Sequence, residues 1–374
     1  MKKGINRLMI FNIVLIVFLL VNSFILNILS YTSLAILLAI LIVIFKFIFG
    51  LEKDNHRYIK DIVFNIIIVL LSSFIVYYLF GLTISFVKTD NYYTVSGFKN
   101  YIIPFIIIGI LREYLRYQML SKCGKSKTLI IISTVTFILI DITVRFNIHD
   151  FATKFDTFLF VARILMPAIS RNIACSYIAR KVGYKPNIIW TLVVVLYSNL
   201  LPIVPNTGIY IGSMISFLYP VVIMYSVYSF FKRRAKNIPL QDDRKRNYLT
   251  IPILVVIIGI IVYFTSGFFR YYTIAIATGS MTPNILKGDV VIIDQEYPKE
   301  DMKVGQVIAY RIEGIIVVHR LVDIIELDGE RFYYTQGDAN NAVDNYTIKE
   351  DMILGVVEHK IPYIGLPTVW LNEL

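Results

Sequence analysis

A short polar stretch in the last third of the chain offers a hydroxyl nucleophile. Ser280 lies in Thr278-Gly279-Ser280-Met281-Thr282-Pro283, directly after a long apolar run. A serine after glycine is often an ordinary turn residue, and its hydroxyl is a poor nucleophile at neutral pH. Catalysis would need a base, a group that orients the base, and donors for the oxyanion. Residue types suited to these roles follow in three further segments, 288–293, 317–320 and 337–344.

Taken together and in this order, the four segments resemble the conserved boxes of the ER-type branch of type I signal peptidases. That branch uses Ser and His where the usual bacterial enzymes use Ser and Lys. The resemblance covers roughly residues 249–374. It implies a membrane-bound serine endopeptidase that removes signal peptides from exported preproteins. Ser280 would be the nucleophile, and its own N–H and the Thr278 hydroxyl would face the oxyanion.

The resemblance also implies the base. His319, in Val-Val-His-Arg, occupies the base position, 39 residues after Ser280. Histidine suits this role because its ordinary pKa lies near neutral pH. The predicted topology excludes His56 and leaves His149 and His359 open.

Two carboxylates compete to orient that histidine. Asp338 and Asp344 stand six residues apart in Gly-Asp-Ala-Asn-Asn-Ala-Val-Asp, and this spacing matches the two acidic positions of the ER-type pattern. We favour Asp344 as the orienting residue and Asp338 as a residue that forms the loop. The alternative is that these aspartates and the neighbouring Asn340 and Asn341 make Asx-turns in an exposed loop.

The composition indicates a polytopic membrane protein. Of the 374 residues 57% are hydrophobic, and the mean hydropathy is +0.67, too apolar for a soluble protein. Residues 1–269 hold 28 Lys and Arg against 10 Asp and Glu, whereas residues 270–374 hold 9 against 16. This distribution fits the bias of cations toward cytoplasmic loops better than it fits a nucleic-acid-binding surface, so we expect no nucleic acid as a partner. The two cysteines, Cys123 and Cys175, form no metal spacing, so we expect no metal or cofactor.

The long apolar runs predict an α-helical membrane bundle with about nine spans. A cytoplasmic N-terminus then places most Lys and Arg on the cytoplasmic side and the C-terminal part outside, at the cell membrane. The predicted domains are a polytopic region of about eight spans, a basic cytoplasmic linker, a membrane anchor and an extracytoplasmic catalytic domain, at 1–231, 232–248, 249–269 and 270–374.

The catalytic domain is predicted to be small and mostly antiparallel β, because short runs rich in Val, Ile, Tyr and Phe alternate with turn residues. The predicted strands are 273–278, 289–294, 306–311, 314–322, 331–336 and 353–360. The resemblance implies signal peptides of exported preproteins as substrates, bound as an extended segment with small side chains before the cut. The expected partners are the lipid bilayer and the secretion machinery or accessory subunits.

Several charged residues interrupt the apolar runs. We interpret most of them as helix ends whose long side chains reach the membrane interface, with a functional intramembrane site as the alternative. They are Arg112, Glu113, Arg116, Asp141, Arg163 and Arg171.

Three other functions compete with the peptidase. A transporter or channel with an outer binding domain is favoured by the eight earlier spans. A Ser/Lys self-cleaving domain is disfavoured because no lysine occurs between positions 303 and 349. A catalytically inactive partner scaffold is disfavoured by the retained serine, histidine and two aspartates.

Overall fold

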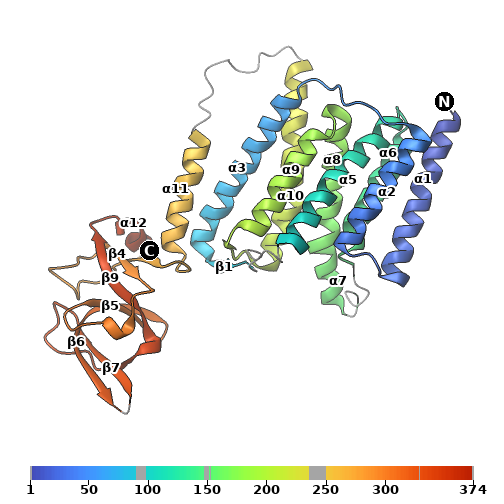
Figure 1. Cartoon of the computed structure of the whole chain (residues 1–374). Helices are drawn as coiled ribbons and strands as arrows, with labels where there is room; N and C mark the ends of the chain where they lie inside the picture. Colours follow the sequence, from blue (N-terminus) through green and yellow to red (C-terminus); the bar gives the residue numbers. More distant parts are fainter. Residues whose placement is uncertain are drawn as a thin grey trace. The chain divides into compact units, whose positions relative to one another are not determined.

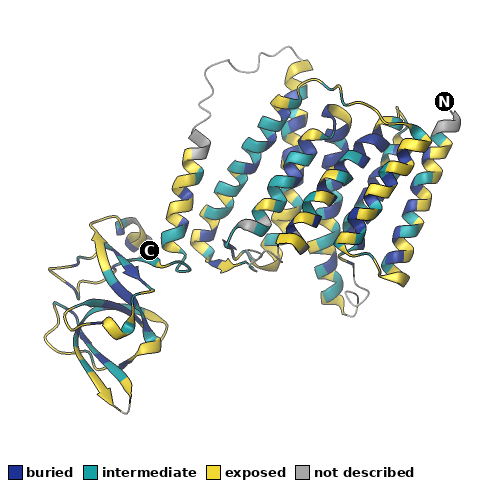
Figure 2. Ribbon diagram, in the orientation of Figure 1, coloured by how far each residue is buried: buried dark blue, intermediate teal, exposed yellow. Residues whose placement is uncertain are grey.

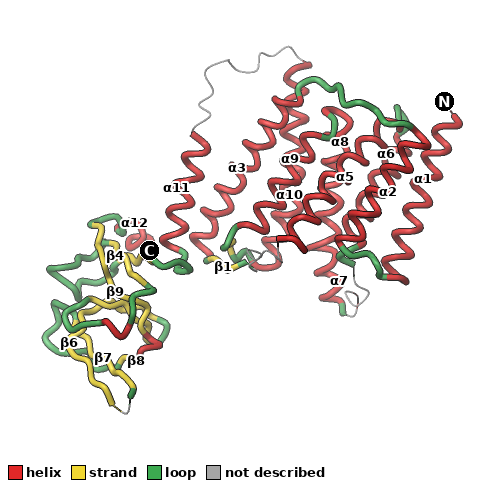
Figure 3. Tube along the Cα trace, viewed as in Figure 1, coloured by secondary structure: helices red, strands yellow, loops and turns green. Residues whose placement is uncertain are grey.

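The structure is a computed structural model that describes residues 2–89, 98–146, 151, 153–235, 250–327 and 329–372. The chain divides into two compact units, Met1–Ile253 and Leu254–Leu374. The first unit is helical, and the second is built around a β-sheet (Figures 1 and 3). Except for positions 232–235, the predicted linker 232–248 lies outside the described residues.

Long apolar helices make up the first unit, because Leu, Ile, Val and Phe dominate these stretches. Their ends follow local signals: a capping box formed by Ser30 and Ser33 starts α2, and Gly50, at φ +70°, ends it. The helices are α1 (Lys2–Val21), α2 (Tyr31–Phe49), α3 (Ile59–Ile84), α5 (Ile103–Lys122), α6 (Lys127–Thr143), α7 (Lys154–Phe160), α8 (Met166–Val182), α9 (Lys185–Leu200) and α10 (Gly208–Ala235).

Shorter elements complete the helical unit. Two short strands, β1 (Phe86–Lys88) and β2 (Ile203–Pro205), pair antiparallel. Buried residues gather on the helix faces that meet inside the bundle, whereas many residues on the outside are exposed (Figure 2). The exposed residues include many Ile, Val and Phe. Such an apolar exterior fits a lipid environment. The π-helical segments are η1 (Asn22–Leu26), η2 (Phe98–Ile102) and η4 (Val161–Leu165).

The predicted nine spans are not supported. Among the described residues, five helices are long and apolar enough to cross a membrane. The other four predicted runs form helices that are shorter than these five or carry several charges: α6 has 17 residues, α9 and α11 (Thr250–Thr265) have 16, and α5 carries three charges in its middle. The five helices are Ile5–Leu26, Tyr31–Phe49, Ile59–Ile84, Lys154–Val182 and Gly208–Ala235.

The predicted antiparallel β domain is confirmed. All six predicted strands are present within a few residues, and a seventh, the two-residue β8, was not predicted. The strand order is β3-β4-β9-β5-β6-β7-β8, and every neighbouring pair is antiparallel. The strands are β3 (Tyr271–Ala275), β4 (Val290–Asp294), β5 (Val307–Ile312), β6 (Ile315–Leu327), β7 (Glu330–Gln336), β8 (Ile348–Lys349) and β9 (Ile353–Ile361).

The sheet buries side chains in two clusters, one around Tyr310, Leu321 and Tyr333 and the other around Met281 and Val291. Irregularities in the pairing of β4 with β9, β5 with β9 and β6 with β7 bend the strands. The sheet can therefore enclose apolar side chains in two places. Three short helical segments, η5 (Lys299–Asp301), η6 (Glu350–Met352) and α12 (Leu366–Asn372), lie between or after the strands.

Candidate active site

Ser280 lies in the loop between β3 and β4. Hydrogen bonds from Thr282 N–H to Gly279 O at 3.1 Å and from Ile285 N–H to Met281 O at 2.9 Å turn this loop tightly. Met281 is 1% exposed and Ile285 is 5% exposed, and both are part of the buried cluster around Val291. These apolar anchors hold the loop on the sheet, while Ser280 itself stays half-buried.

His319 faces that serine from β6. Its Nε2 lies 3.0 Å from Ser280 Oγ, within hydrogen-bonding distance for proton transfer. The strand is paired on both sides, and His319 lies opposite Ile308 of β5. The imidazole is 12% exposed. Its position is therefore set by a central strand of the sheet rather than by a loop.

Asp344 meets the other imidazole nitrogen. Its Oδ2 lies 2.6 Å from His319 Nδ1. An ionised carboxylate can only accept a hydrogen bond, so this contact favours the tautomer with Nδ1–H directed at Asp344. Nε2 is then left free to accept the Ser280 proton. The residue lies in the loop after β7, and its N–H donates to Thr335 O at 2.8 Å.

Two hydroxyls support the same carboxylate oxygen. Thr335 Oγ1 lies 2.7 Å and Tyr310 OH 3.2 Å from Asp344 Oδ2. Thr335 and Tyr310 are both fully or almost fully buried, at 0% and 1% exposed. Burial raises the pKa of Tyr310 to about 12, so its hydroxyl keeps the proton that it donates. Both hydroxyls therefore donate to the carboxylate oxygen that faces His319.

Asp338 has a different partner. Arg320 binds it with two hydrogen bonds, Nε to Oδ1 and a terminal nitrogen to Oδ2, both 2.7 Å. Asn284 Nδ2 donates to Oδ2 at 2.7 Å. The pKa of Asp338 lies below its ordinary value because Arg320 donates to it, although partial burial opposes this shift. The structure thus brings Asp344, and not Asp338, to the histidine.

The loop that contains Asp338 also contacts the backbone of Ser280. Ala339 N–H donates to Ser280 O at 2.8 Å. A Cβ atom on Gly337 would stand 2.7 Å from the same carbonyl oxygen, so a glycine at this position allows the two loops to approach. Thr278 Oγ1 lies 3.4 Å from Ser280 Oγ.

The other two described histidines lie elsewhere. His56, in the helical unit, has Nδ1 2.8 Å from Asp54 Oδ1. His359 is on β9 opposite Ile292, and His149 lies outside the described residues.

Sequence reasoning missed Tyr310, Thr335 and Arg320 as parts of this site. The sequence offered one indication for Arg320: it directly follows the candidate base His319, and a cation at that position is expected to pair with a nearby carboxylate. Tyr310 and Thr335 carried no such signal, because alternating strand residues of these types are common in buried sheets.

No protein-family model matches the chain. The signal peptidase complex catalytic subunit sec11 of Schizosaccharomyces pombe is 27% identical over 158 aligned residues, covering 32% of this chain and 83% of that protein. The corresponding subunit of Yarrowia lipolytica is 31% identical over 142 residues, covering 32% and 81%. That of Plasmodium falciparum is 30% identical over 110 residues, covering 27% and 58%.

Proposed function

The chain belongs to the family of signal peptidase complex catalytic subunits named SEC11, and we propose that it is a membrane-bound serine endopeptidase that removes signal peptides from exported preproteins. The observation that carries this proposal is the hydrogen-bonded line from Ser280 through His319 to Asp344. It joins a hydroxyl, an imidazole and a carboxylate in the order that acyl transfer by a serine requires.

In the proposed reaction, Ser280 Oγ attacks the scissile carbonyl carbon while His319 Nε2 takes the hydroxyl proton. The tetrahedral intermediate collapses as the imidazolium gives this proton to the leaving amine, which is the new N-terminus of the mature protein, and the signal peptide remains as an acyl ester on Ser280. A water molecule then attacks the ester with His319 again acting as base, which releases the carboxylate and restores the hydroxyl.

The oxyanion of each intermediate is bound by the Ser280 N–H and the Thr278 hydroxyl. The support for Thr278 is its position beside the nucleophile, 3.4 Å from Ser280 Oγ. A donor of this kind typically contributes a factor of about 10²–10³ to the rate.

Asp344 stabilises the imidazolium that forms in each step. Its charge is held in place by the Thr335 and Tyr310 hydroxyls, which donate to the oxygen that faces His319. The carboxylate therefore need not reorganise when the histidine becomes charged, which is the main requirement for electrostatic catalysis.

Asp338 acts as a positioning residue. Its pairing with Arg320 ties the loop after β7 to the strand that carries His319. The same loop donates from Ala339 N–H to the carbonyl of Ser280. Through these contacts Asp338 fixes the distance between the nucleophile and the base.

The substrate binds as an extended strand. Among the described strands β3 is an edge strand of the sheet, and the chain runs from its last residue, Ala275, into the loop of Ser280. An edge strand offers unpaired backbone groups that an extended peptide can pair with. Ala277, which lies between β3 and Ser280, is exposed, and the small residues that precede a signal-peptide cleavage site would bind along this stretch.

The sheet unit works outside the cytoplasm. α10 ends in Lys232, Arg233 and Arg234, which favour the cytoplasmic side, whereas residues 270–374 carry an acidic excess. α11, between these two stretches, anchors the sheet unit in the bilayer. Accessory subunits or the secretion machinery deliver the substrate, since the similar proteins of S. pombe and Y. lipolytica are subunits of a complex.

The test is cleavage of a model preprotein by the full-length chain reconstituted in liposomes. Ser280→Ala should reduce product formation to the level of protein-free liposomes while leaving insertion unchanged, because it removes one half-exposed hydroxyl. Ser266→Ala, which also removes a hydroxyl in the second unit, is the matched control and should cleave normally. Cleavage by Ser280→Ala at the wild-type rate would refute the proposal.

A further inference from the structure

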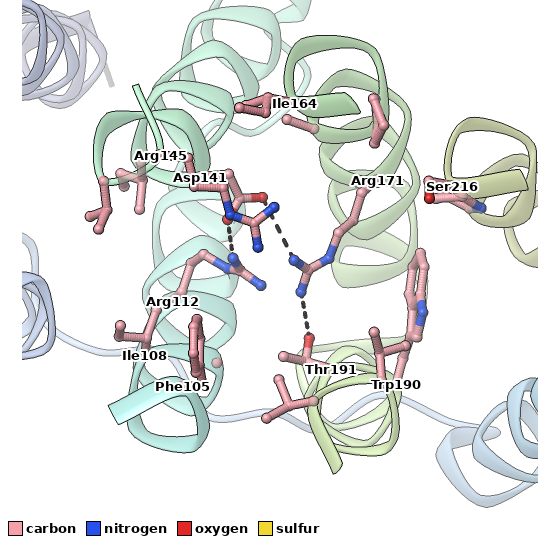
Figure 4. A pocket seen from close by; sticks show the side chains of 18 of the residues that line it. Phe105, Ile108, Arg112, Asp141, Arg145, Ile164, Arg171, Trp190, Thr191 and Ser216 are labelled. Atoms are coloured by element: carbon pink, nitrogen blue, oxygen red, sulfur yellow. Dashed lines mark hydrogen bonds and ion pairs between the residues drawn. The ribbon is translucent and has the colours of Figure 1, made fainter. Parts of the chain in front are cut away.

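A cavity of about 510 Å³ lies within the helical unit, lined by residues of α2, α5, α6, α8, α9 and α10 (Figure 4). This volume is within the usual range for small-molecule sites. The peptidase proposal makes no use of this cavity.

One side of the cavity borders a buried network of charges. Arg112, Glu113 and Arg116 lie in the middle of α5 and are 5%, 0% and 0% exposed. Glu113 accepts from Arg116 Nε at 2.9 Å and from Arg112 Nε at 3.1 Å. The interpretation of these three residues as helix ends that reach the interface is therefore wrong.

A second carboxylate joins the network from α6. Asp141 pairs with Arg112 through Oδ1, and its Oδ2 accepts from Asn172 Nδ2 at 2.7 Å. Asn172 also accepts from Arg116 at 2.5 Å. Two guanidinium groups and two carboxylates thus balance one another, and their hydrogen-bonding groups are well satisfied, as buried charges require.

Arg171 adds a positive charge to this network, for which no further carboxylate has been described above. Its side chain, on α8, lies 28% exposed beside the cavity, and its nearest described carboxylate oxygen is Asp141 Oδ2 at 3.8 Å. It also donates to Thr191 Oγ1 at 3.1 Å. Figure 4 shows Arg112 and Arg171 reaching toward Asp141 from opposite sides of the cavity. Arg145, just after α6, is a further cation in the lining.

The rest of the wall is largely apolar and closely packed. Ile108, Ile164, Trp190 and Val194 are among its residues. A Cβ atom on Gly109 would stand 2.6 Å from the Thr191 methyl group, so this glycine permits the close approach of α5 and α9 beside the cavity. An apolar chamber with a positive charge at one side matches a molecule that carries a negative group on an apolar body.

We propose that this cavity binds an amphiphile with one oxyanion group, held by Arg171, and an alkyl part that lies against Ile164, Trp190 and Val194. With Arg171 the network holds three guanidinium groups against two carboxylates; an excess charge in an apolar surrounding is costly, and a bound anion lowers that cost. A guanidinium also matches the geometry of carboxylate and phosphate oxygens. Two sources supply this chemistry, an anionic phospholipid of the bilayer and a free fatty acid.

Trp190 provides a direct assay, because bromine atoms quench tryptophan fluorescence at short range. The chain has two tryptophans, so Trp370→Phe leaves Trp190 as the sole reporter. The full-length protein in detergent is titrated with dibromostearate, with brominated phosphatidylglycerol and with brominated phosphatidylcholine, whose net charge is zero. We expect saturable quenching by at least one of the two anions and weak, unsaturated quenching by phosphatidylcholine. The anion that saturates identifies the source.

Variants separate the charge from the fold. Arg171→Gln should raise the half-saturating concentration at least about tenfold, and Arg171→Lys should raise it less. Arg180→Gln removes the same charge from the exposed surface of α8 and should leave it unchanged. Val194→Phe, which fills the apolar wall without altering charge, should weaken binding even if Arg171→Gln fails to fold. Equal quenching by phosphatidylcholine, or saturation that neither Arg171→Gln nor Val194→Phe alters, would overturn the proposal.

Discussion

Replacing Asp344 by Asn tests the proposed role of this carboxylate in the most direct way. The substitution keeps the size of the side chain and an oxygen that can accept from Thr335, Tyr310 and His319, which lie 2.7, 3.2 and 2.6 Å from Oδ2. It removes the negative charge. We therefore expect the sheet unit to fold and the chemical step to slow.

The size of the effect follows from the distance and the burial. The side chains of His319 and Asp344 are 12% and 10% exposed, so an effective dielectric constant of about 20 is appropriate. Opposite charges about 4 Å apart then attract by about 4 kcal/mol. Losing that attraction in the transition state lowers the rate about 10³-fold. If the Asn amide turns its NH₂ toward Nδ1, the wrong tautomer results and the loss approaches about 10⁴-fold.

The assay is single-turnover cleavage of a model preprotein by wild-type and Asp344→Asn protein in matched liposomes, with thermal unfolding measured on the same samples. Asp351→Asn, an equal change of charge at an exposed residue of η6, is the control and should retain wild-type turnover. A loss of less than about tenfold with unchanged unfolding would show that Asp344 does not stabilise the histidine cation.

Three further predictions test the neighbouring residues and the architecture. Asp338→Asn should cost the sheet unit about 1–2 kcal/mol of unfolding free energy and slow turnover less than Asp344→Asn; equal turnover losses with unchanged melting for both variants would contradict this division. Because pairing with Arg320 lowers the folded pKa of Asp338, its stabilisation is complete above the unfolded pKa of about 3.9 and is lost as the pH falls through the folded pKa. Urea unfolding at pH 6 and pH 3 should therefore show wild type and Asp338→Asn converging at the lower pH. His319→Lys should leave cleavage close to background, since Asp344 would keep the lysine charged; normal processing by this variant would exclude the Asp–His arrangement. A chain beginning near Lys232 should insert and still cleave a short preprotein, whereas a correctly inserted but inactive truncation would make the helical unit part of the catalytic machinery.

The sequence alone identified the residue types of the site and their order. Ser280 stands in a distinctive polar segment, and the segments that contain His319, Asp338 and Asp344 follow it in a fixed sequence. Strand positions were also predictable, because short runs of Val, Ile and Tyr between turn residues have few other interpretations. These features could be predicted because they depend only on residues that are close together in the sequence.

The membrane spans were harder to predict for a physical reason. An apolar run shows where a helix can form, but the length of the helix depends on where its ends are capped and on what it packs against. The run at 187–205 ends as a helix at Leu200 because the following residues form β2. The positions of Arg112 and Glu113 could not be predicted from the sequence either. A charged residue in an apolar run can be buried with partners or can lie at the membrane interface, and the sequence is the same in both cases.

Only the tertiary structure shows which of the two aspartates lies against His319. Asp338 and Asp344 stand in the same segment, and nothing local distinguishes their chemistry. The pairing of β6 with β7 places Arg320 opposite Gln336, close to Asp338, while Thr335 binds both the backbone and the side chain of Asp344 and directs that carboxylate to His319. These contacts join positions that are 18, 9 and 25 residues apart. Contacts over such sequence separations are set by strand register and by the bending of the sheet. Both depend on packing between different segments, so no pattern within a single segment predicts them.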